Sequence, residues 1–378
     1  MKILHLSHTD IRSDSRILKE IFSLARNGYS VNGIGIHADD GSKRSDFDAN
    51  AEILILQLFA RKLTFLPKTL KHLLVFFEMM IKMIPSAILT RPIIVHCHDT
   101  SVLPIAVIVK FFTKAKLIYD AHELESNRNG LTQLQGKLIF FVENILWQFI
   151  DHLIVVSPSI QQWYQETIGS KSSDVILNSP TISNQHQSKD NYLRTKFSIS
   201  KQCLIFIYVG ILGKGRGLEK VIEVFSDLED SAHLILLGYG EFADQLQNNQ
   251  FNNIHLHEPV PHAEVVGIIQ SADYGLCLIE RISLSDYYCL PNKLFEYCFA
   301  GVPVIASDFP DIRTLVSEYN IGICCDPDSH SLNRAILSLI NSQPKFIFND
   351  LSILSWQEQE HKLLHLYQKL TPQLPINK

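Results

Sequence analysis

The residues best suited to chemistry gather in residues 290–307, which read as a loop, a helix, a turn and a buried strand. Pro291 fixes φ where a helix can begin, and Gly301 ends that helix before the strand. Backbone N–H groups at a helix N-terminus lack helical partners and attract a phosphate, and Lys293 adds a positive charge. Glu296, one turn later, is placed to accept hydrogen bonds from sugar hydroxyl groups. The stretch therefore predicts a site for a nucleoside diphosphate with its ribose.

A second candidate phosphate site is the glycine-rich loop at residues 210–217, which follows a strand-like run at residues 204–209. Glycines let the backbone approach a phosphate, while Lys214 and Arg216 supply charge. The spacing of the glycines matches neither the P-loop nor the dinucleotide-binding fingerprint. The loop therefore predicts phosphate contacts without identifying the nucleotide.

Two buried strands, at residues 93–98 and 115–119, end in polar residues. Asp99 follows the first strand, and Asp120-Ala121-His122-Glu123 follows the second. The C-terminal ends of parallel strands meet at one edge of a sheet, so we expect these side chains to lie together. The alternative is that each polar residue only caps the next helix.

His96 and His98 have a spacing that could suggest a metal site. We expect alternate strand residues to face opposite sides of the sheet, and no third ligand is evident. Two Asp-x-Asp sequences, at residues 46–48 and 326–328, have the form found in metal-dependent sugar transferases, but both lie in loop-like surroundings. We therefore predict no metal and no cofactor.

The chain is long enough for two domains that hold these residues in place. It has 378 residues, of which 46% are hydrophobic and 19% charged. Its net charge of -5 argues against a general nucleic-acid binder, which needs a clustered basic surface. The seven cysteines show neither a C-x-x-C pair nor zinc spacing, which indicates free thiols in a reducing compartment.

Strand-like and helix-like runs alternate along the whole chain. A strand at residues 3–7, a polar loop that contains Asp14 and Arg16, a helix and another strand predict a parallel sheet. Residues 181–190 lose the apolar pattern and mark a linker. We predict α/β domains at residues 1–182 and 183–355, followed by an amphipathic helix within residues 356–378.

These motifs resemble those of retaining glycosyltransferase family 4, whose members have the GT-B fold. The resemblance rests on Glu296 with Ala300-Gly301-Val302-Pro303, on the loop at residues 210–217 and on the run that contains His122. It covers nearly the whole chain. It implies two Rossmann-like domains facing a cleft, with the terminal helix crossing back to the first domain. It also implies transfer of a sugar from a nucleotide-diphosphate-sugar donor to an acceptor hydroxyl, with retention and without a metal ion.

The resemblance implies that His122 is catalytic and contacts the transferred sugar and the donor phosphate. Glu296 is expected to bind the ribose. In the first loop the resemblance is to a D-x-R version of the family loop, although a salt-bridged helix start explains the same residues. The expected donor-binding residues are Gly210, Lys214, Arg216, Asn292, Lys293 and Glu296, and the expected acceptor-side residues are Asp14, Arg16, Asp99 and Glu123.

The sequence departs from the family pattern at two positions. Tyr288 stands where an E-x7-E pattern has its first glutamate, with Asp286 and Glu280 as nearby candidates. Ile211 stands where a basic residue is usual, and Lys214 is placed to compensate. These departures keep open a degenerate GT-B protein that binds a nucleotide or a partner without turnover. A sugar-nucleotide epimerase is the other alternative, because another GT-B family catalyses that reaction.

Residues 61–91 form a basic and strongly apolar segment with helical spacing. One interpretation is an amphipathic surface that rests on anionic lipid, as suits a lipid-linked acceptor in bacterial surface-polysaccharide assembly. The interpretation we favour is a helix packed on the sheet with lysines at its rim. Glu78, Lys82 and Pro85 interrupt the segment, so no membrane span is expected. With no signal peptide at residues 1–8, the predicted location is cytoplasmic or peripheral at the inner face of the plasma membrane.

Overall fold

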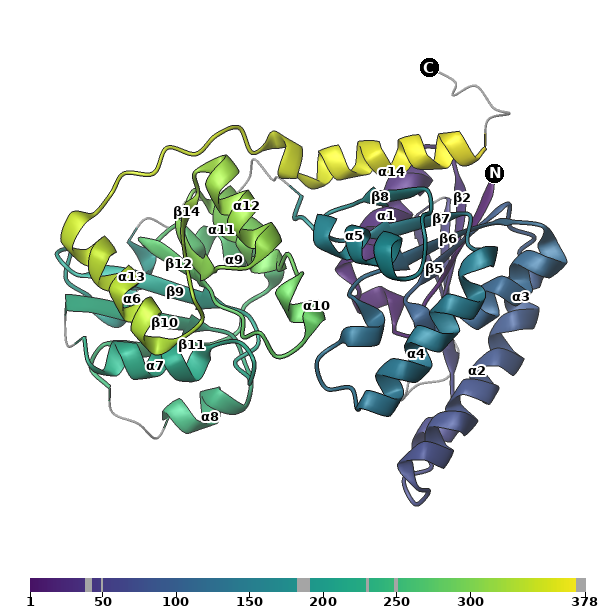
Figure 1. Ribbon diagram of the computed structural model, residues 1–378, viewed down its shortest axis with the longest axis horizontal. Coiled ribbons are helices and arrows are strands. Elements are labelled where there is room, and N and C mark those ends of the chain that lie inside the picture. Colours follow the sequence, from purple (N-terminus) through teal and green to yellow (C-terminus); the bar gives the residue numbers. More distant parts are fainter. Residues whose placement is uncertain (38–42, 49, 182–190, 229–230, 248–250, 372–378) are drawn as a thin grey trace. The chain divides into compact units, whose positions relative to one another are not determined.

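The computed structural model describes residues 1–37, 43–48, 50–181, 191–228, 231–247 and 251–371, in two compact units (Figure 1). Unit 1 comprises Met1–Ile176 with Glu360–Lys378, and unit 2 comprises Leu177–Gln359. The final helix, α14 (Trp356–Leu370), therefore returns to unit 1 from Glu360 onward. This confirms the predicted return of the terminal helix to the first domain.

Unit 1 is built on a sheet of eight described strands in the order β3-β4-β2-β1-β5-β6-β7-β8. Neighbouring strands pair in parallel, except that β3 runs antiparallel to β4 at the edge. This order places β1 and β5 side by side at the centre. Strands that follow β1 are added on one side of it up to β4, and from β5 onward on the other side. The strands are β1 (Lys2–Leu6), β2 (Ser30–His37), β3 (Lys43–Asp48), β4 (Ala51–Gln57), β5 (Ile94–His98), β6 (Lys116–Ala121), β7 (His152–Val155) and β8 (Ser173–Val175).

Helices cover both faces of this sheet. One face carries α1 (Ser15–Arg26) together with α14, since Glu20 of α1 and Tyr367 of α14 both contact His96 of β5. The other face carries a row in which α3 contacts α2 and α4, and α4 contacts α5 through Glu143 and Tyr164. The row consists of α2 (Lys68–Leu89), α3 (Leu103–Thr113), α4 (Gln133–Leu146) and α5 (Pro158–Thr167).

Local sequence explains where these helices begin. Asp14 precedes α1 and accepts hydrogen bonds from the backbone N–H groups of Arg16 and Ile17, which have no helical acceptor. Thr132 and Gln135 form a reciprocal capping box at the start of α4. Short 3-10 turns complete unit 1: Ile11–Ser13, Phe59–Lys62, Thr100–Val102, Glu125–Asn127 and Trp147–Phe149.

The segment at residues 61–91 differs from the favoured expectation. Only Met79, Met83 and Ala87 of α2 are buried, so most of its apolar surface is not packed on the sheet. Two polar residues in the centre of α2, Glu78 and Lys82, instead face the protein. Glu78 accepts from the backbone N–H groups of Phe59 and Ala60, and Lys82 donates to Glu78 and to the carbonyl of Gln57. By length and composition, α2 is long and apolar enough to cross a membrane, as core helices of soluble proteins also are.

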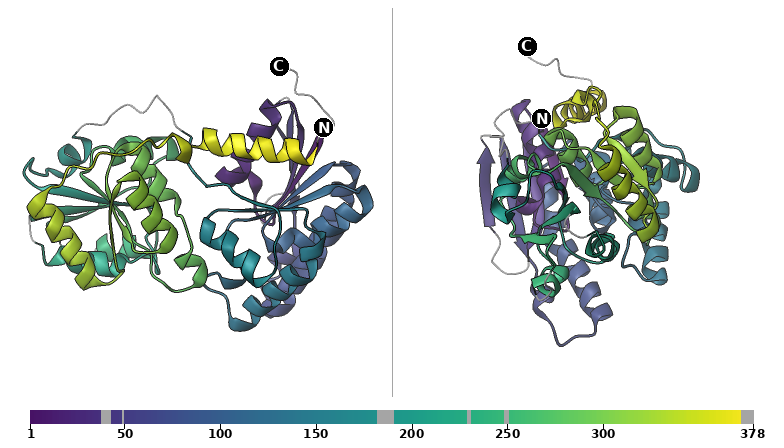
Figure 2. Two further views of the ribbon diagram at one scale, coloured as in Figure 1. Left: turned by 45° about the horizontal axis from the view of Figure 1, so that its top comes forward. Right: turned by 90° about the vertical axis from the view of Figure 1, so that its left-hand side faces the viewer.

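Unit 2 is a second parallel α/β unit, with helices on both sides of its sheet (Figure 2). Its six described strands have the order β11-β10-β9-β12-β13-β14, and all pair in parallel. The strands are β9 (Leu204–Val209), β10 (Ala232–Leu237), β11 (Ile254–His257), β12 (Tyr274–Cys277), β13 (Val304–Ser307) and β14 (Gly322–Cys325). The helices are α6 (Tyr192–Phe197), α7 (Leu218–Ser226), α8 (Glu241–Gln247), α9 (His262–Ile269), α10 (Leu284–Tyr287), α11 (Asn292–Ala300), α12 (Pro310–Tyr319) and α13 (Ser329–Ser342).

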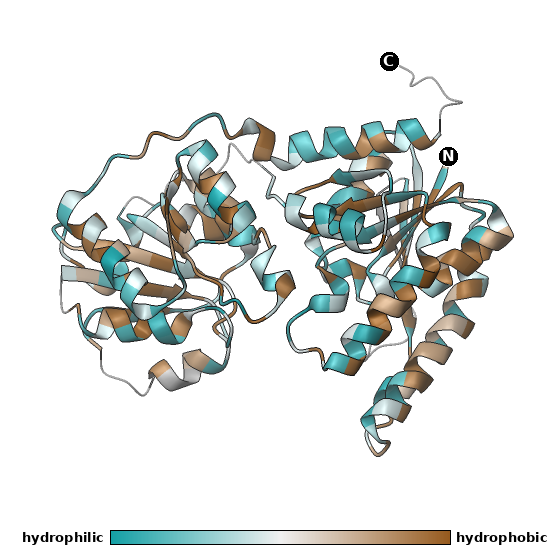
Figure 3. Cartoon of the chain, in the orientation of Figure 1, coloured by the Kyte–Doolittle hydropathy of each residue, from teal (hydrophilic) through white to brown (hydrophobic). Residues whose placement is uncertain are grey.

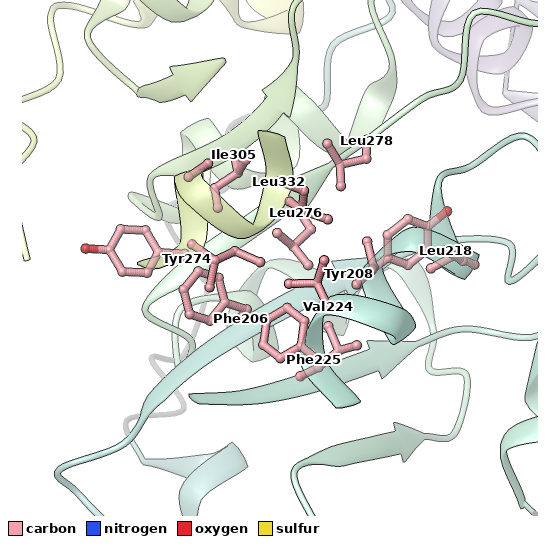
Figure 4. Close-up of a cluster of buried hydrophobic side chains, with 14 of the residues drawn as sticks. Phe206, Tyr208, Leu218, Val224, Phe225, Tyr274, Leu276, Leu278, Ile305 and Leu332 are labelled. Atoms are coloured by element: carbon pink, nitrogen blue, oxygen red, sulfur yellow. The ribbon is translucent and has the colours of Figure 1, made fainter. Parts of the chain in front are cut away.

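One core of unit 2 lies between the sheet and the pair α7 and α13 (Figure 4). Phe206 of β9 packs against Phe225 of α7 and stacks on Tyr274 of β12. Leu332 joins this cluster from α13. Burial of such large side chains stabilises the unit by roughly 1.5–3 kcal/mol each, and it fixes the strands whose C-terminal ends carry the predicted phosphate loops.

Candidate functional site

Helix α11 in unit 2 is held to the sheet by Tyr297. Its hydroxyl oxygen accepts from the backbone N–H of Val209 at 3.0 Å, and the carbonyls of Ile207 and Leu276 lie 3.1 and 3.2 Å away as acceptors. Gly275 makes room for the ring, since a Cβ there would lie 2.6 Å from it. The helix begins at Asn292 and ends before Gly301, whose φ of +72° suits glycine. These contacts fix the first turn of α11 relative to β9.

Lys293, in that first turn, is a buried cation. Its side chain lies over the Tyr208 ring, with Nζ 3.7 Å from the ring centroid. Among the described residues Nζ has no hydrogen-bond partner. Burial lowers the pKa of Lys293 to about 8, against the smaller opposing effects of Cys277 and Glu296. Glu296, one turn on, is also buried, and Asn292 is exposed. A buried ammonium without a partner is suited to bind an anion.

The glycine-rich loop begins beside this lysine. Gly210 has a φ of +126°, and a Cβ there would lie 3.9 Å from Nζ of Lys293. A Cβ at Gly238 would lie 1.8 Å from the carbonyl oxygen of Gly210, so only glycine allows the ends of β9 and β10 to approach in this way. Lys214 is exposed and Arg216 is half-buried. The structure thus brings together Gly210 and Lys293, while Lys214 lies on the surface.

The two carboxylates considered as substitutes for the first glutamate of the E-x7-E pattern, Glu280 and Asp286, are bound to other residues. Glu280 pairs with Lys220 of α7. Asp286 accepts from the hydroxyl of Ser283 at the start of the short helix α10. Tyr288 follows that helix directly and is half-buried. Ile211, at the other departure from the family pattern, is 53% exposed and brings no charge to the loop.

In unit 1, His122 follows β6 and lies among charged groups. Its Nε2 lies 3.0 Å from Nδ1 of His98 and 3.3 Å from Oδ2 of Asp120. Burial alone would lower the pKa of His122, but the negative charges of Asp99 and Asp120 outweigh it and raise the pKa to about 10. The side chain keeps 18% of its surface exposed. His122 is therefore a partly accessible imidazolium at neutral pH.

Asp99 is the second predicted residue at this edge. Its φ of +66° is unusual for a residue with a side chain, and such strain costs about 1–3 kcal/mol. Oδ2 lies 3.7 Å from Nδ1 of His8, while the buried Oδ1 has no hydrogen-bond partner among the described residues. Burial opposes ionisation, yet the charges of His122 and His8 hold the pKa of Asp99 below its usual value. Glu123, the neighbour of His122, is exposed.

The structure corrects the acceptor-side expectation for the first loop. The Arg16 side chain is only 2% exposed, and its Nε and Nη2 donate to the two carboxylate oxygens of Asp120 at 3.1 and 3.0 Å. Nη1 donates to the carbonyl of Ile176 at 2.9 Å. With its guanidinium engaged in the interior, Arg16 does not present a surface to an acceptor. Asp14 caps α1, and Arg16 forms ion pairs with Glu20 and Asp120, so the interpretation as a helix start accounts for Asp14 and that of a salt bridge for Arg16.

The expectation for His96 and His98 was also wrong, because residues two apart on a strand face the same side. Their rings stack with centroids 4.4 Å apart, and Nδ1 of His5 lies 2.9 Å from Nε2 of His98. Glu20 of α1 reaches the same layer. Two groups of side chains place one possible metal-binding atom per residue within 4.8 Å of one another. The first group is His5, Glu20, His96 and His98, and the second is His98, Asp120 and His122.

The first of these groups has the residue types of a metal site but not its geometry. A metal must lie in the plane of each imidazole that binds it. The His96 ring instead lies parallel to that of His98, at an angle of 14°, so their nitrogens cannot converge on one ion. The facing nitrogens of His5 and His98 are already hydrogen-bonded to each other. This stacking argues against an ion bound by both His96 and His98. Of the Asp-x-Asp residues, Asp328 caps α13, and the side chains of Asp46 and Asp48 lie outside the described part of the chain.

Sequence reasoning missed most of this buried polar layer. His5, Glu20, Asp120 and Tyr367 belong to it, and none was predicted as a site residue. One indication was present: polar residues at alternate positions of β5, and one in the middle of β1, are unusual in central strands of a parallel sheet.

Comparison with known proteins identifies the family. A model described as Glycosyltransferase Family 4 matches residues 20–180, and one described as Glycosyl transferases group 1 matches residues 190–347. The chain is 23% identical to the chitobiosyldiphosphodolichol beta-mannosyltransferase of Kluyveromyces lactis, over 90% of this chain and 83% of that protein. It is 22% identical to the phosphatidyl-myo-inositol mannosyltransferase of Mycobacterium tuberculosis strain H37Rv, over 65% of this chain and 62% of that protein.

Solved structures agree on the fold. The sucrose-phosphate synthase of Thermosynechococcus elongatus has a TM-score of 0.78 at 15% identity and covers 98% of this chain and 99% of its own. The Anabaena protein HepE in complex with UDP-glucose has a TM-score of 0.67 at 16% identity and covers 98% of both chains. With one family model on each α/β unit, the chain belongs to the group 1 glycosyltransferases, family 4, and has the GT-B fold.

Proposed function

We propose that this chain transfers a sugar from a nucleotide-diphosphate sugar to an acceptor hydroxyl. The observation that carries the proposal is the buried ammonium of Lys293, unpartnered among the described residues and placed beside Gly210 and the first turn of α11. A diphosphate would supply the missing partner, and the backbone N–H groups of that turn would add hydrogen bonds. Glu296, on the next turn, would accept from the ribose hydroxyls.

The departing nucleoside diphosphate carries negative charge that the protein must stabilise. We assign this role to Lys293, Arg216 and the N-terminus of α11, with no divalent ion required. Lys293 therefore takes the place of the cation that Ile211 does not provide. The direct check is turnover after exhaustive chelation with EDTA, which is expected to leave the rate unchanged; a rate restored only by added Mg²⁺ or Mn²⁺ would contradict this assignment.

On the sugar side, the proposal gives His122 the catalytic role that its motif implies. Its imidazolium would donate a hydrogen bond to the transferred sugar or its phosphate. Oδ1 of Asp99, buried and without a partner among the described residues, would accept from a hydroxyl group. We expect His122→Ala chiefly to lower kcat, and Glu296→Ala chiefly to raise the KM for the donor. Wild-type kinetics in both variants would contradict the assignment.

We further propose that the anomeric configuration is retained. The support is the family 4 motif around Glu296. One relative is named for a beta linkage, so the product's configuration must be measured directly. NMR of the anomeric proton in the first product formed distinguishes retention from inversion.

The proposed acceptor is lipid-linked, as in the assembly of bacterial surface polysaccharide or glycolipid, and unit 1 has a surface suited to a membrane. On α4, Leu134, Leu138, Phe141 and Ile145 follow helical spacing and are all exposed. On α2, Leu70, Leu73, Phe77 and Ile81 are exposed as well. Figure 3 shows the apolar character of α2, α3 and α4, and α3 contacts both of its neighbours.

The charges on these helices favour anionic lipid. Their carboxylates are Glu78, which is bound to backbone N–H groups, and Glu143, which is buried. The exposed charges are lysines, among them Lys68, Lys114 and Lys137. We therefore propose that this face, with residues 61–91 as one part, rests on an anionic membrane surface.

The experiment that tests the proposed function is a thermal-shift screen of the purified chain against nucleoside diphosphates and nucleotide sugars, repeated with Glu296→Ala. We expect nucleotides with one particular base to raise the unfolding temperature of the wild type, and we expect this increase to be lost in Glu296→Ala. Donor consumption that depends on an added acceptor then separates transfer from epimerisation, which needs no acceptor. Binding without any consumption would favour a degenerate protein.

A further inference from the structure

His122 is the outer member of a chain of three imidazoles that enters the core of unit 1. Nε2 of His122 lies 3.0 Å from Nδ1 of His98, and Nε2 of His98 lies 2.9 Å from Nδ1 of His5. His5 and His98 are fully buried. In each contact, Nε2 of the outer ring faces Nδ1 of the next ring inward.

Asp120 sets the direction of these hydrogen bonds. Its Oδ2 lies 3.3 Å from Nε2 of His122 and 3.5 Å from Nδ1 of His98, so we infer that the proton between the two rings sits on the nearer nitrogen, Nε2 of His122. Nδ1 of His98 must then accept, which leaves the proton of His98 on Nε2. That Nε2–H donates in turn to Nδ1 of His5. The pKa values agree with this direction, since burial lowers that of His98 to about 4, while Asp99 and Asp120, against the effect of burial, raise that of His122 to about 10.

Asp120 is itself held by Arg16 from α1. Two guanidinium nitrogens donate to its two oxygens, and a third donates to the Ile176 carbonyl, so the carboxylate cannot rotate independently. Burial opposes ionisation, but the charges of Arg16 and His122 hold the pKa of Asp120 well below its usual value. The group that orients His122 is thus a fixed, ionised carboxylate.

The hydrogen bonds of His122 within the described residues all use Nε2. We propose that Asp120 is a positioning residue that keeps His122 doubly protonated with Nδ1–H available to the substrate, and that His98 and His5 support the ring from behind. This inference rests on the proposed function, because it defines how His122 would serve as a donor of a hydrogen bond rather than as a base. Burial and the neighbouring histidines lower the pKa of His5, and burial lowers that of His98 to about 4, so both rings stay neutral acceptors and donors.

The pH dependence follows from the groups that face His122. These are Asp99 and Asp120, whose charges favour the imidazolium, Arg16, whose charge opposes it, the imidazoles of His8 and His98, whose own pKa values burial lowers, and Glu20, whose pKa burial and Asp120 raise to about 8. The folded pKa of about 10 lies above the ordinary value of 6.5, so the imidazolium persists at neutral pH and is lost only as the pH rises towards 10. Removing the Asp120 charge moves that loss to lower pH.

The test combines nitrogen NMR with kinetics on the full chain. Protein labelled with ¹⁵N-histidine reports which ring nitrogens carry protons, and the His122 signals are assigned by their loss in His122→Gln. In the ligand-free wild type at neutral pH we expect protons on both nitrogens of His122, and on Nε2 alone in His98 and His5. An unprotonated Nε2 in His122, or an Nδ1–H in His98, would overturn the proposal without need of any further variant.

Asp120→Asn is the informative variant. We expect one nitrogen of His122 to lose its proton at neutral pH, kcat to fall about tenfold to a hundredfold, and the donor KM to change less than about threefold. The alkaline limb of the kcat profile moves down by about three pH units, to near neutral pH. Asp120→Glu restores the charge and should restore both protons. A His122 that keeps both protons in Asp120→Asn would contradict the proposal.

Two further variants separate positioning from folding. His98→Gln leaves the pair of Arg16 and Asp120 intact and is expected to lower kcat about threefold to tenfold, and it serves if Asp120→Asn does not fold. The matched control is His152→Gln, since His152 is equally buried in the sheet and bound to Asp174 at 2.9 Å but does not contact His122. It should leave kcat and the His122 protons unchanged. A doubly protonated His122 without any glycosyl transfer would support the hydrogen-bond chain and count against the proposed function alone.

Discussion

Replacing Lys293 with methionine is expected to stabilise the ligand-free protein and to weaken nucleotide binding. The ammonium is buried, has no hydrogen-bond partner among the described residues and lies over the Tyr208 ring. Methionine has a similar length and no charge to desolvate. The two effects have opposite signs, which distinguishes a ligand-binding cation from one that stabilises the fold.

The magnitude follows from the pKa. Burial lowers the pKa of Lys293 from 10.5 to about 8, and each unit of pKa corresponds to about 1.4 kcal/mol, so the charge costs roughly 3 kcal/mol on folding. Its contact with the face of Tyr208 returns about 1–2 kcal/mol. The net gain from Lys293→Met is therefore about 1–2 kcal/mol, and nucleotide binding should weaken about tenfold to a hundredfold from the loss of one charge-assisted hydrogen bond.

The pH dependence has a definite sign. Because the folded pKa lies below the unfolded value, the cost of the charge is fully present below about pH 8 and disappears as the pH rises towards 10.5. The stability advantage of Lys293→Met should shrink over that range, and nucleotide binding by the wild type should weaken. Urea denaturation and calorimetric titration with nucleoside diphosphates measure the two quantities.

Lys214→Met is the matched control, because Lys214 is an exposed cation in the neighbouring loop. It should change stability by less than about 0.5 kcal/mol. If Lys293→Met is less stable than the wild type and binds nucleotide equally well, the argument that this ammonium is reserved for a ligand is refuted.

Three other changes test the scaffold and the membrane face. Gly238→Ala forces a Cβ against the Gly210 carbonyl and should cost several times the roughly 1 kcal/mol of Gly28→Ala, which has a positive φ but no close neighbour; unfolding midpoints of both variants provide the comparison. Tyr297→Phe leaves the Val209 amide without its acceptor and should cost about 1–3 kcal/mol in urea denaturation, with equal stability as the contrary result. Leu138→Glu on α4 should abolish flotation with anionic liposomes at low salt, whereas Leu337→Glu on α13 should not; equal flotation of both variants would refute the proposed face.

Features encoded by neighbouring residues could be predicted from the sequence. The helix expected after Pro291 and before Gly301 is α11, since one residue fixes φ and the other accepts a positive φ. Alternating strands and helices likewise indicated two parallel sheets, which the structure confirms except at β3, an antiparallel edge strand of unit 1. In these cases the deciding interactions lie within a few positions along the chain.

Features that depend on which face is buried could not be predicted in this way. The sequence of α2 has a wide apolar stripe, and helical periodicity alone does not say whether that stripe faces the sheet or the outside. In the structure Glu78 and Lys82 satisfy polar groups of the protein, while Phe77 and Ile81 remain exposed. The binding partners of two polar side chains, and not the apolar pattern, decided the orientation.

The buried layer of unit 1 depends on strand register. His5 lies opposite His96, and His98 lies opposite Asp120, so three strands bring polar residues to one face. Among these strands, only β5 has two polar residues at alternate positions that indicate a polar face, His96 and His98. We did not predict that face because we expected His96 and His98 to lie on opposite sides of the sheet. The layer needs the parallel pairing of β1, β5 and β6 before its members become neighbours.

The two units hold their central cations differently. In unit 1 the Arg16 guanidinium is matched by Asp120, which also holds His122, before any ligand binds. In unit 2 the ammonium of Lys293 is buried without a hydrogen-bond partner among the described residues. Leaving a buried charge without a partner costs free energy, which a bound anion would recover. Under the proposed function, unit 1 therefore orients a reacting group, and unit 2 gains stability when an anionic ligand binds.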